Sequence, residues 1–553
     1  MKNSAHRRGL RSPALLRCRV CAAATIIGTI IGAACGATAS ASTLTGQVLD
    51  PSGKPEANVF VTARNAARKM SFSVLTDASG HYRLDDLFAG KYELRARKSG
   101  FGDSAGAPLT LDEHDGSADL KLTPDDDTHL STPGTAWLSA LPNGPEKAAF
   151  VTSCTICHDQ ASPFTHVQRD AAGWSAIIAT MKSQADAYSL VLRMDPDHLA
   201  HWLADAKYGA KPAAYDAFAP AAHVATSARV TEYEVGNVNS WEHDLAIEPK
   251  TGIAWVGDYT NDELVAVNPR TGEQKVYPVP VLHSGLHTLN FDRDGLLWMT
   301  FQAAAMVGSF DTANGQWRFY GGFTPGSLNH SFAYDSYGFV KKDAKGRINI
   351  GLWGGNRTAI LDPASGKVQE FTLPGPKTDM PYGIAVDSKG LIWYTKYAEN
   401  KIGWFDPVTG KGKDWELAKP DAGPHRIHID DNDNLWIPLS GYSSVLRYNT
   451  RDGSQKEFPL PDADSFPYDA RYDAKSNRVW VTGNGGNALY ALDPETGRAT
   501  TFRMPSILSY GRVIAFDYST GDVWTALCSY PNKLALRDYG VLVRIHHALD
   551  LVK

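Results

Sequence analysis

The period of apolar and polar positions changes along the chain and divides it into three segments. Residues 44–124 alternate apolar and polar positions in short runs between Asp, Gly, Pro and Ser turns, a pattern typical of β-strands. Residues 136–210 have helical apolar spacing, as in WSAIIATMKSQ and DHLAHWLADAKYG. Strand-like runs return in residues 229–553. The pattern predicts a mainly β multidomain protein, with a β-sandwich, a small α-helical domain and a larger β-domain in that order.

The third segment repeats a tryptophan-centred strand at spacings of 43, 55, 40, 43, 44 and 44 residues. Such a period, with several short strands per unit, indicates a β-propeller, and seven repeats predict seven blades. The longer second interval contains GGFTPGSLNHSFAYDSYG and predicts an insertion at a blade rim. The repeat tryptophans are Trp255, Trp298, Trp353, Trp393, Trp436, Trp480 and Trp524.

Residues 1–41 have a basic start, an apolar stretch and a small-residue exit at Ala39-Ser40-Ala41. This arrangement predicts a cleaved secretory signal peptide, export to the periplasm and no stable membrane span in the mature form. A retained single-span anchor or a lipoprotein anchored at Cys35 are the alternatives. The apolar run is shorter than the roughly 20 residues that a span requires.

Net charge argues against a nucleic-acid partner. The chain has a formal charge of −5, and loss of the six basic residues in 1–41 would leave −11. Proteins that bind nucleic acid usually present a basic surface instead. Three of the six cysteines would leave with the leader, so Cys154, Cys157 and Cys528 would remain. That number excludes a disulfide scaffold.

Cys154-Thr155-Ile156-Cys157-His158 is a CxxCH motif, which is typical of c-type haem attachment. Two thiols three positions apart can add to the two haem vinyl groups, and the following imidazole can bind the iron. A redox CxxC pair or half of a zinc site are the alternatives, but the sequence offers neither a thioredoxin-like βαβ context nor a second cysteine pair. The motif predicts one covalent haem c.

The stretch SPFTHVQRDAAGWSAIIATMKSQ resembles small class I-like cytochromes c, in which an Arg and a Trp precede a helix that presents an iron-binding Met. The matching residues are Arg169, Trp174 and Met181. The resemblance implies a cytochrome c-like domain at 136–210 with Met181 as sixth ligand. Met194, His166 and His198 are the alternatives, and Met181 could also simply fill core space.

Two further segments resemble known families. GQVLDPSGKPEANVFVTA and TDASGHYRLDDLFAGKYELRARKSGF resemble the carboxypeptidase regulatory-like family, which implies a β-sandwich with an adaptor role. GPHRIHIDDNDNLWIPLS and MPYGIAVDSKGLIWYTKYAENKIGWFDPVTGKG resemble the virginiamycin B lyase (streptogramin lyase) family, which implies a seven-bladed propeller with a divalent metal and a general base.

The lyase machinery matches this chain only in part. Its Pro-His element occurs once, at Pro424-His425, and is preceded by Gly423 rather than Glu. In the last blade Tyr510 stands where the family has His, and Cys528 where it has Glu. The partial match therefore argues against streptogramin cleavage, and a divalent metal in the propeller is what the family resemblance alone implies. Cys528 itself is more typical of a buried thiol than of a nucleophile.

Equivalent positions of the blades should ring one mouth of the propeller channel, because they begin the innermost strands. Histidines with nearby arginines suit a small anionic or phenolic ligand. They could equally be rim residues that bond neighbouring blades. The candidate ligand-binding residues are His243, His287, His425, Arg426, Tyr468 and Arg512, with Tyr382, Tyr510, Glu242 and Arg471 beside them.

These features predict a periplasmic cytochrome fusion that transfers electrons to a redox partner protein, with the propeller binding a partner or ligand. The alternative is a propeller enzyme, either a metal-dependent lyase or a dehydrogenase that passes electrons to the haem. A protein that only binds its partners is a third hypothesis.

Overall fold

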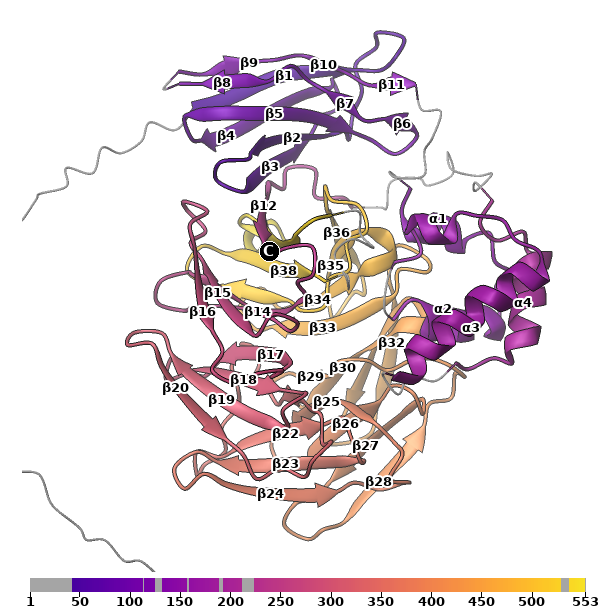
Figure 1. The fold of residues 1–553 in the computed structure, drawn as a ribbon, viewed down its shortest axis with the longest axis vertical. Coiled ribbons are helices and arrows are strands. Elements are labelled where there is room, and N and C mark those ends of the chain that lie inside the picture. The colour runs from indigo at the N-terminus through magenta and orange to yellow at the C-terminus, as the bar shows by residue number, and fades with distance from the viewer. Residues whose placement is uncertain are drawn as a thin grey trace, which may run out of the picture. The chain divides into compact units, whose positions relative to one another are not determined.

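The computed structural model describes residues 42–112, 114–124, 132–156, 159–187, 192–210, 223–528 and 537–552 (Figure 1). The predicted signal peptide, 1–41, lies outside these residues. Strands dominate the described chain, which contains five α-helices, so the prediction of a mainly β protein is confirmed. None of the described helices is long and apolar enough to cross a membrane.

The N-terminal domain is β-sandwich-like, as predicted. One sheet has the order β10-β1-β4, and the strands β3-β2-β5-β7 form the other layer. In β4 the buried residues Tyr82 and Leu84 alternate with the exposed residues His81 and Arg83, as a strand with one face on the core requires. The strands are β1 (Ser42–Leu49), β2 (Phe60–Asn65), β3 (Met70–Leu75), β4 (His81–Leu87), β5 (Gly90–Arg97), β6 (Phe101–Gly102), β7 (Ser104–Ala105), β8 (Leu109–Leu111), β9 (Gly116–Ser117), β10 (Leu120–Lys121) and β11 (Thr123–Pro124).

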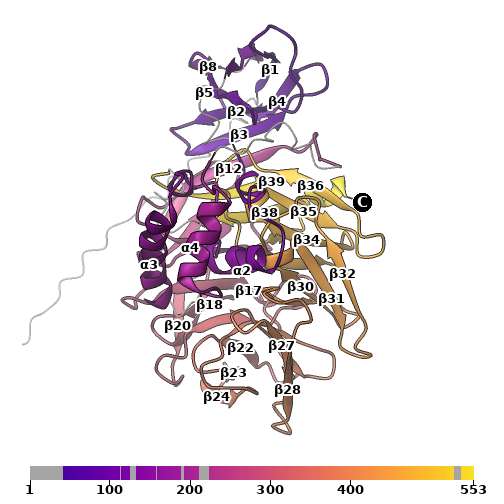
Figure 2. The ribbon, with the colours of Figure 1, turned by 90° about the vertical axis from the view of Figure 1, so that its right-hand side faces the viewer.

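The middle segment is helical, and Figure 2 shows α3 and α4 side by side. Asp195 caps α4 by accepting hydrogen bonds from the backbone N–H groups of Asp197 and His198. Pro196 follows as the first helical residue, where its missing N–H costs nothing. The helices are α1 (Gly134–Leu138), α2 (Pro145–Cys154), α3 (Ala171–Ala187) and α4 (Pro196–Asp205), with a 3₁₀ turn at Pro163–Thr165.

The C-terminal domain is built from four-stranded antiparallel blades, numbered 1 to 7 along the chain. Blades 1 to 6 are β13–β16, β17–β20, β21–β24, β25–β28, β29–β32 and β33–β36, and blade 7 is β37, β38, β39 and β12. The strands are β12 (Val230–Val235), β13 (Glu242–Ile247), β14 (Ala254–Asp258), β15 (Glu263–Val267), β16 (Gln274–Pro278), β17 (Leu286–Phe291), β18 (Leu297–Phe301), β19 (Met306–Asp311), β20 (Gln316–Tyr320), β21 (Asn329–Phe332), β22 (Ile348–Leu352), β23 (Arg357–Asp362), β24 (Lys367–Thr372), β25 (Pro381–Val386), β26 (Ile392–Lys396), β27 (Lys401–Phe405), β28 (Gly412–Glu416), β29 (His428–Ile429), β30 (Asn434–Leu439), β31 (Ser444–Asn449), β32 (Gln455–Pro459), β33 (Pro467–Asp473), β34 (Arg478–Gly483), β35 (Ala488–Leu492), β36 (Ala499–Arg503), β37 (Ala515–Asp517), β38 (Asp522–Leu527) and β39 (Gly540–Ile545). Two 3₁₀ turns, Ser440–Tyr442 and Asn484–Gly486, and the short helix α5 (Ala548–Leu551) complete the domain.

A buried hydrogen bond accompanies the repeat tryptophan in blades 2, 4 and 5. In blade 2, Asp292 closes the turn between β17 and β18, and its other carboxylate oxygen accepts a 2.7 Å hydrogen bond from the indole N–H of Trp298. Blades 4 and 5 repeat this pair with Asp387–Trp393 and Asp430–Trp436, at 3.0 and 3.1 Å. A buried indole usually finds such an acceptor, and in these three blades the Asp of the turn supplies it.

One repeat was assigned incorrectly from the sequence. Trp353 follows β22 instead of lying within it. Asn349 holds the blade position, since it pairs with Ile360 as Trp298 pairs with Ser309. The extra residues of blade 3 therefore lie between β21 and β22, at 333–347, where blades 2 and 4 use five residues.

Blade 7 closes the propeller by combining strands from both ends of the domain. β12 pairs antiparallel with β39, from Val230 opposite Ile545 to Val235 opposite Gly540. The other edge of β12 pairs with β3 of the sandwich, where Tyr233 lies opposite Met70. The two domains therefore share one continuous sheet.

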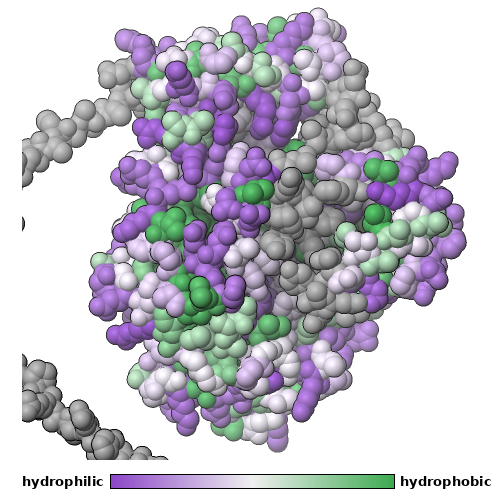
Figure 3. All heavy atoms as spheres, viewed as in Figure 1, coloured by the Kyte–Doolittle hydropathy of each residue, from purple (hydrophilic) through white to green (hydrophobic). Residues whose placement is uncertain are grey.

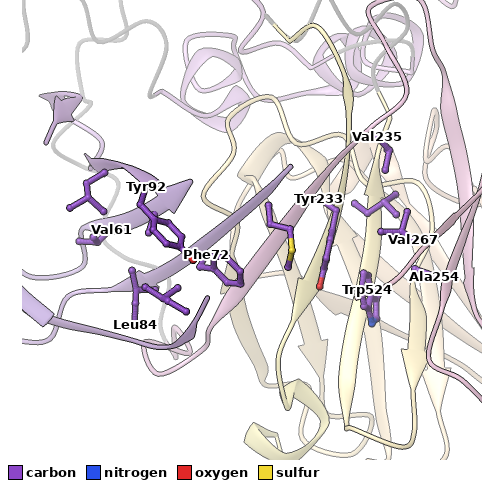
Figure 4. Close-up of a cluster of buried hydrophobic side chains, with 14 of the residues drawn as sticks. Val61, Phe72, Leu84, Tyr92, Tyr233, Val235, Ala254, Val267 and Trp524 are labelled. Carbon is purple, nitrogen blue, oxygen red and sulfur yellow. The ribbon is translucent and has the colours of Figure 1, made fainter. Parts of the chain in front are cut away.

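A shared apolar core accompanies this sheet (Figure 4). It includes Phe72 and Tyr92 from the sandwich together with Tyr233, Val235 and Trp524 from the propeller. The rings of Tyr233 and Trp524 stack with centroids 5.4 Å apart. On the face drawn in Figure 3, hydrophobic residues form scattered groups among hydrophilic ones.

Candidate functional site

A ring of histidine and tyrosine side chains lies at one end of the propeller channel, with one residue from each blade. The inner strands carry a β-bulge at this level, as between Glu242 and Leu245 or between Leu286 and Leu289. Bulges re-aim side chains and are common beside functional sites. The seven buried members of this aromatic ring are His243, His287, His330, Tyr382, His425, Tyr468 and Tyr510.

Neighbouring members are in contact. Ring centroids are 3.7 Å apart for His243 and His287, 4.4 Å for His287 and His330, and 4.5 Å for His330 and Tyr382. Further round the ring, the centroid of His425 lies 5.1 Å from that of Tyr382 and 4.4 Å from that of Tyr468. The centroids of Tyr468 and Tyr510 are 6.2 Å apart. The structure thus brings together the histidine and tyrosine positions predicted from the sequence. Arg471, predicted beside them, instead lines a separate pocket with Tyr337 and Tyr518, so that part of the prediction is wrong.

His330 was missed by the sequence analysis. It lies five residues before Asp335, as His287 lies five before Asp292. This spacing could have identified His330 as a ring position. The alignment of blade 3 on Trp353 instead of Asn349 obscured it.

The four histidines are neutral at physiological pH. Burial lowers the pKa of His243 well below its usual value, and the positive charges of Arg512 and Arg426 lower it further. Burial likewise lowers the pKa of His287 and His425, and that of His330 to about 3.

Two buried arginines lie against the ring in different electrostatic environments. Arg426 makes a two-pronged ion pair with Asp244, at 2.7 and 3.1 Å. Arg512 makes no ion pair within the described chain; instead, it donates to the hydroxyl of Tyr468 at 3.1 Å and to the carbonyl of Ile156 at 3.1 Å. The charge of Arg512 therefore faces the CxxCH motif without a carboxylate to balance it.

The helical segment covers this end of the channel. The hydroxyl of Tyr510 donates a 2.8 Å hydrogen bond to the carbonyl of Ile156, and Tyr397 donates to the carbonyl of Thr152. Tyr382, Tyr468 and Tyr510 belong to one apolar cluster with Trp137, Phe150 and Trp174 of the helical segment.

Two ion pairs reinforce the contact, Lys147 with Asp464 at 2.6 Å and Arg193 with Asp421 at 2.8 Å. The aromatic ring is thus a buried interface within the chain.

The predicted haem residues lie at this contact as far as they are described. Cys154 is the last residue of α2 and packs against the apolar cluster of the helices. Cys157 and His158 lie outside the described residues. Met181 lies on α3 with 47% of its surface exposed, whereas Met194 is partly buried against the same cluster as Cys154.

The remaining candidates have local partners. The guanidinium of Arg169 lies 4.9 Å from the ring centroid of Trp174. His166 stacks on Trp137 with centroids 3.5 Å apart, and His198 is exposed on α4. Within the described chain no group of three or more His, Cys, Asp or Glu side chains has the arrangement of a metal site.

Cys528 is fully buried beside the aromatic ring. Burial raises the pKa of its thiol to about 12, and the indole N–H of Trp241 points to its sulfur. Such a thiol is protonated and a poor nucleophile.

Comparison with known proteins confirms both family resemblances of the β-domains. The carboxypeptidase regulatory-like domain matches residues 43–123. No curated protein sequence matches the chain significantly. Among solved structures, virginiamycin B lyase from Staphylococcus aureus is 20% identical, with a TM-score of 0.47 over 57% of this chain and 98% of its own.

A streptogramin B lyase structure is also 20% identical, with a TM-score of 0.48 over 57% of this chain and 97% of its own. The Virginiamycin B lyase family matches residues 228–534, which is more than half of the sequence. The chain therefore belongs to the virginiamycin B lyase family.

Proposed function

We propose that this protein is an exported, periplasmic c-type cytochrome fusion that exchanges electrons with a partner protein through one covalent haem, while the propeller holds the haem domain in place. The observation that supports this proposal is the contact between the CxxCH motif and the propeller. Cys154 ends α2, and the carbonyl of Ile156, inside the motif, accepts hydrogen bonds from Tyr510 and Arg512 of the propeller. When bound, haem would supply one-electron transfer.

The surroundings of Cys154 suit a porphyrin. The cysteine packs against the apolar cluster of the helices, as do Ile177, Leu192, Met194 and Trp202. An apolar surround protects a haem from water and tunes its potential. Cys154 and Cys157 would hold the group covalently, and His158 would present its imidazole.

The propeller residues favour a docking role over lyase chemistry. Where the family resemblance implies a histidine, Tyr510 instead uses its hydroxyl to hold Ile156. Where it implies a glutamate, the buried thiol of Cys528 has a raised pKa. The helical segment also covers the ring, since Tyr510 and Tyr397 bond to its backbone carbonyls.

A second candidate is oxidation of a small molecule in the propeller, with electrons passed to the haem. A chain of hydrogen bonds favours it: the hydroxyls of Tyr382 and Tyr468 bond each other, and Arg512 links Tyr468 to the carbonyl of Ile156. Anaerobic mixing with hydroquinone would test this. Tyr468→Phe should slow haem reduction at least tenfold relative to the control Tyr277→Phe, which changes a half-buried tyrosine of the outer strand β16. Equal rates would contradict the route.

The main proposal is tested by a pyridine haemochrome and redox-difference spectrum of the protein produced with haem c maturation. The expected result is one covalent haem, absent in Cys157→Ala and retained in Cys528→Ala, which also removes a cysteine. A wild-type protein without covalent haem would overturn the proposal.

A further inference from the structure

The insertion of blade 3, residues 333–347, covers the end of the channel opposite the aromatic ring. Ring residues lie near the beginnings of the inner strands, and the insertion follows the end of β21. The backbone N–H of Val340 donates to the carbonyl of Phe291 in blade 2 at 2.9 Å. The ring of Tyr337 lies 5.8 Å from that of Tyr518 in blade 7. The insertion therefore reaches across the channel axis.

A pocket of about 170 Å³ lies under the insertion. Its walls include the aromatic side chains Tyr337, Phe516 and Tyr518, with Asn290, Arg471 and Asp517 as polar members. A cavity of roughly 150 Å³ is enough to hold benzene. The pocket can therefore hold one substituted aromatic ring.

Arg471 lines this pocket with hydrogen-bond donors that a ligand acceptor could pair. Arg471 is 2% exposed, and its Nε and Nη2 atoms donate no hydrogen bond within the described chain. The nearest carboxylate, Asp469, lies 4.0 Å from Nε and already accepts bonds from His428 and the backbone of Ile514. Leaving a buried donor unpaired costs about 1 to 3 kcal/mol, and a guanidinium fork matches a carboxylate.

Asp517 is a second polar residue of the pocket that restricts the ligand. It is 6% exposed, and one of its oxygens accepts hydrogen bonds from the backbone N–H and hydroxyl of Ser519. Its negative charge disfavours a dicarboxylate and favours a ligand group that can donate a hydrogen bond.

We propose that this pocket binds a hydroxylated aromatic carboxylate. The carboxylate pairs with Arg471, the ring packs between Tyr337, Phe516 and Tyr518, and the hydroxyl donates to Asp517. The site lies at the other end of the inner strands from the aromatic ring and does not depend on haem. Its binding is expected whether or not the electron-transfer proposal holds.

Calorimetric titration with 4-hydroxybenzoate tests the proposal on the full chain. Wild type and the haem-free variant Cys157→Ala should bind alike, which separates this test from that of the haem. Arg471→Lys keeps the charge but loses the fork and should weaken binding at least tenfold. Tyr337→Ala, at a partly exposed wall with little effect on folding, should weaken it several-fold. The exposed control Arg318→Gln should bind like wild type.

The ligand series tests each polar contact. Benzoate, without the hydroxyl, should bind several-fold more weakly, and 4-hydroxybenzyl alcohol, without the carboxylate, should not bind measurably. Absence of saturable 4-hydroxybenzoate binding would overturn the proposal, and so would wild-type affinity in both Arg471→Lys and Tyr337→Ala. Equal affinity for benzoate would remove Asp517 from the site and overturn the hydroxylated class.

Discussion

The hydroxyl of Tyr510 donates a 2.8 Å hydrogen bond to the carbonyl oxygen of Ile156, which lies 354 positions earlier in the chain. Tyr510 is a member of the aromatic ring, and Ile156 belongs to the CxxCH motif. This bond, with that of Arg512 to the same oxygen, ties the motif to the last blade of the propeller. Changes in the blade should therefore alter the properties of the motif.

Arg512→Gln should lower the reduction potential of the attached haem. Arg512 makes no ion pair within the described residues, and a buried positive charge near the motif favours the more electron-rich state. The expected shift is a few tens of millivolts, on the order of 1 kcal/mol. Potentiometric titration measures it. The exposed substitution Arg318→Gln serves as control, and an unchanged potential in Arg512→Gln would contradict the electrostatic coupling.

Acidification should destabilise the propeller through its buried histidines. Burial lowers the pKa of His330 to about 3, against about 6.5 when unfolded. Between these values the unfolded chain binds more protons, so stability falls as pH falls below about 6.5. At pH 5.5 each such histidine costs about 1 kcal/mol.

Chemical unfolding followed by tryptophan fluorescence at pH 7.5 and 5.5 measures this loss. The loss should be smaller in His330→Gln and unchanged in His201→Gln, which alters an exposed histidine. Equal losses in wild type and His330→Gln would show that His330 does not contribute.

Trp298→Phe should destabilise the propeller by about 1 kcal/mol, because it removes the hydrogen bond to Asp292. Trp353→Phe is the matched control, since Trp353 lies outside the repeat position. Thermal unfolding of the two variants measures the difference. A larger loss in Trp353→Phe would restore the repeat assignment that the structure overturned.

Met181→Ala should remove the long-wavelength thioether-to-ferric-iron band of the haem, whereas Met194→Ala should keep it. The prediction rests on the resemblance of Arg169, Trp174 and Met181 to small cytochromes. Visible absorption and the reduction potential provide two readouts. Loss of the band in Met194→Ala alone would assign the ligand to the methionine that packs with Cys154.

The alternation of apolar and polar positions predicted the β-sandwich, and the tryptophan repeat predicted the propeller. In blades 2, 4 and 5 the repeat Trp bonds to an Asp six residues earlier, as Trp298 does to Asp292, so the pair recurs at fixed spacing. The ring positions followed from the same repeat, except His330, which the insertion displaced.

The position of the helical segment over the aromatic ring could not be predicted from the sequence. It depends on contacts such as Tyr510 with Ile156, between segments that are far apart in the sequence and carry no shared pattern. The pocket at Arg471 was missed for a related reason: its walls come from four blades and from an insertion that the repeat does not contain.

The pairing of β12 with β3 also bears on solubility. The outer strands β16, β20, β24 and β28 of other blades carry mainly exposed or half-exposed residues, whereas every residue of β12 except Glu234 is buried. Without β3, the free edge of β12 would offer unpaired backbone donors and acceptors to any strand it meets, the situation that promotes aggregation. The sandwich thus covers this edge of the propeller sheet. A chain shortened to begin after residue 124 should therefore self-associate.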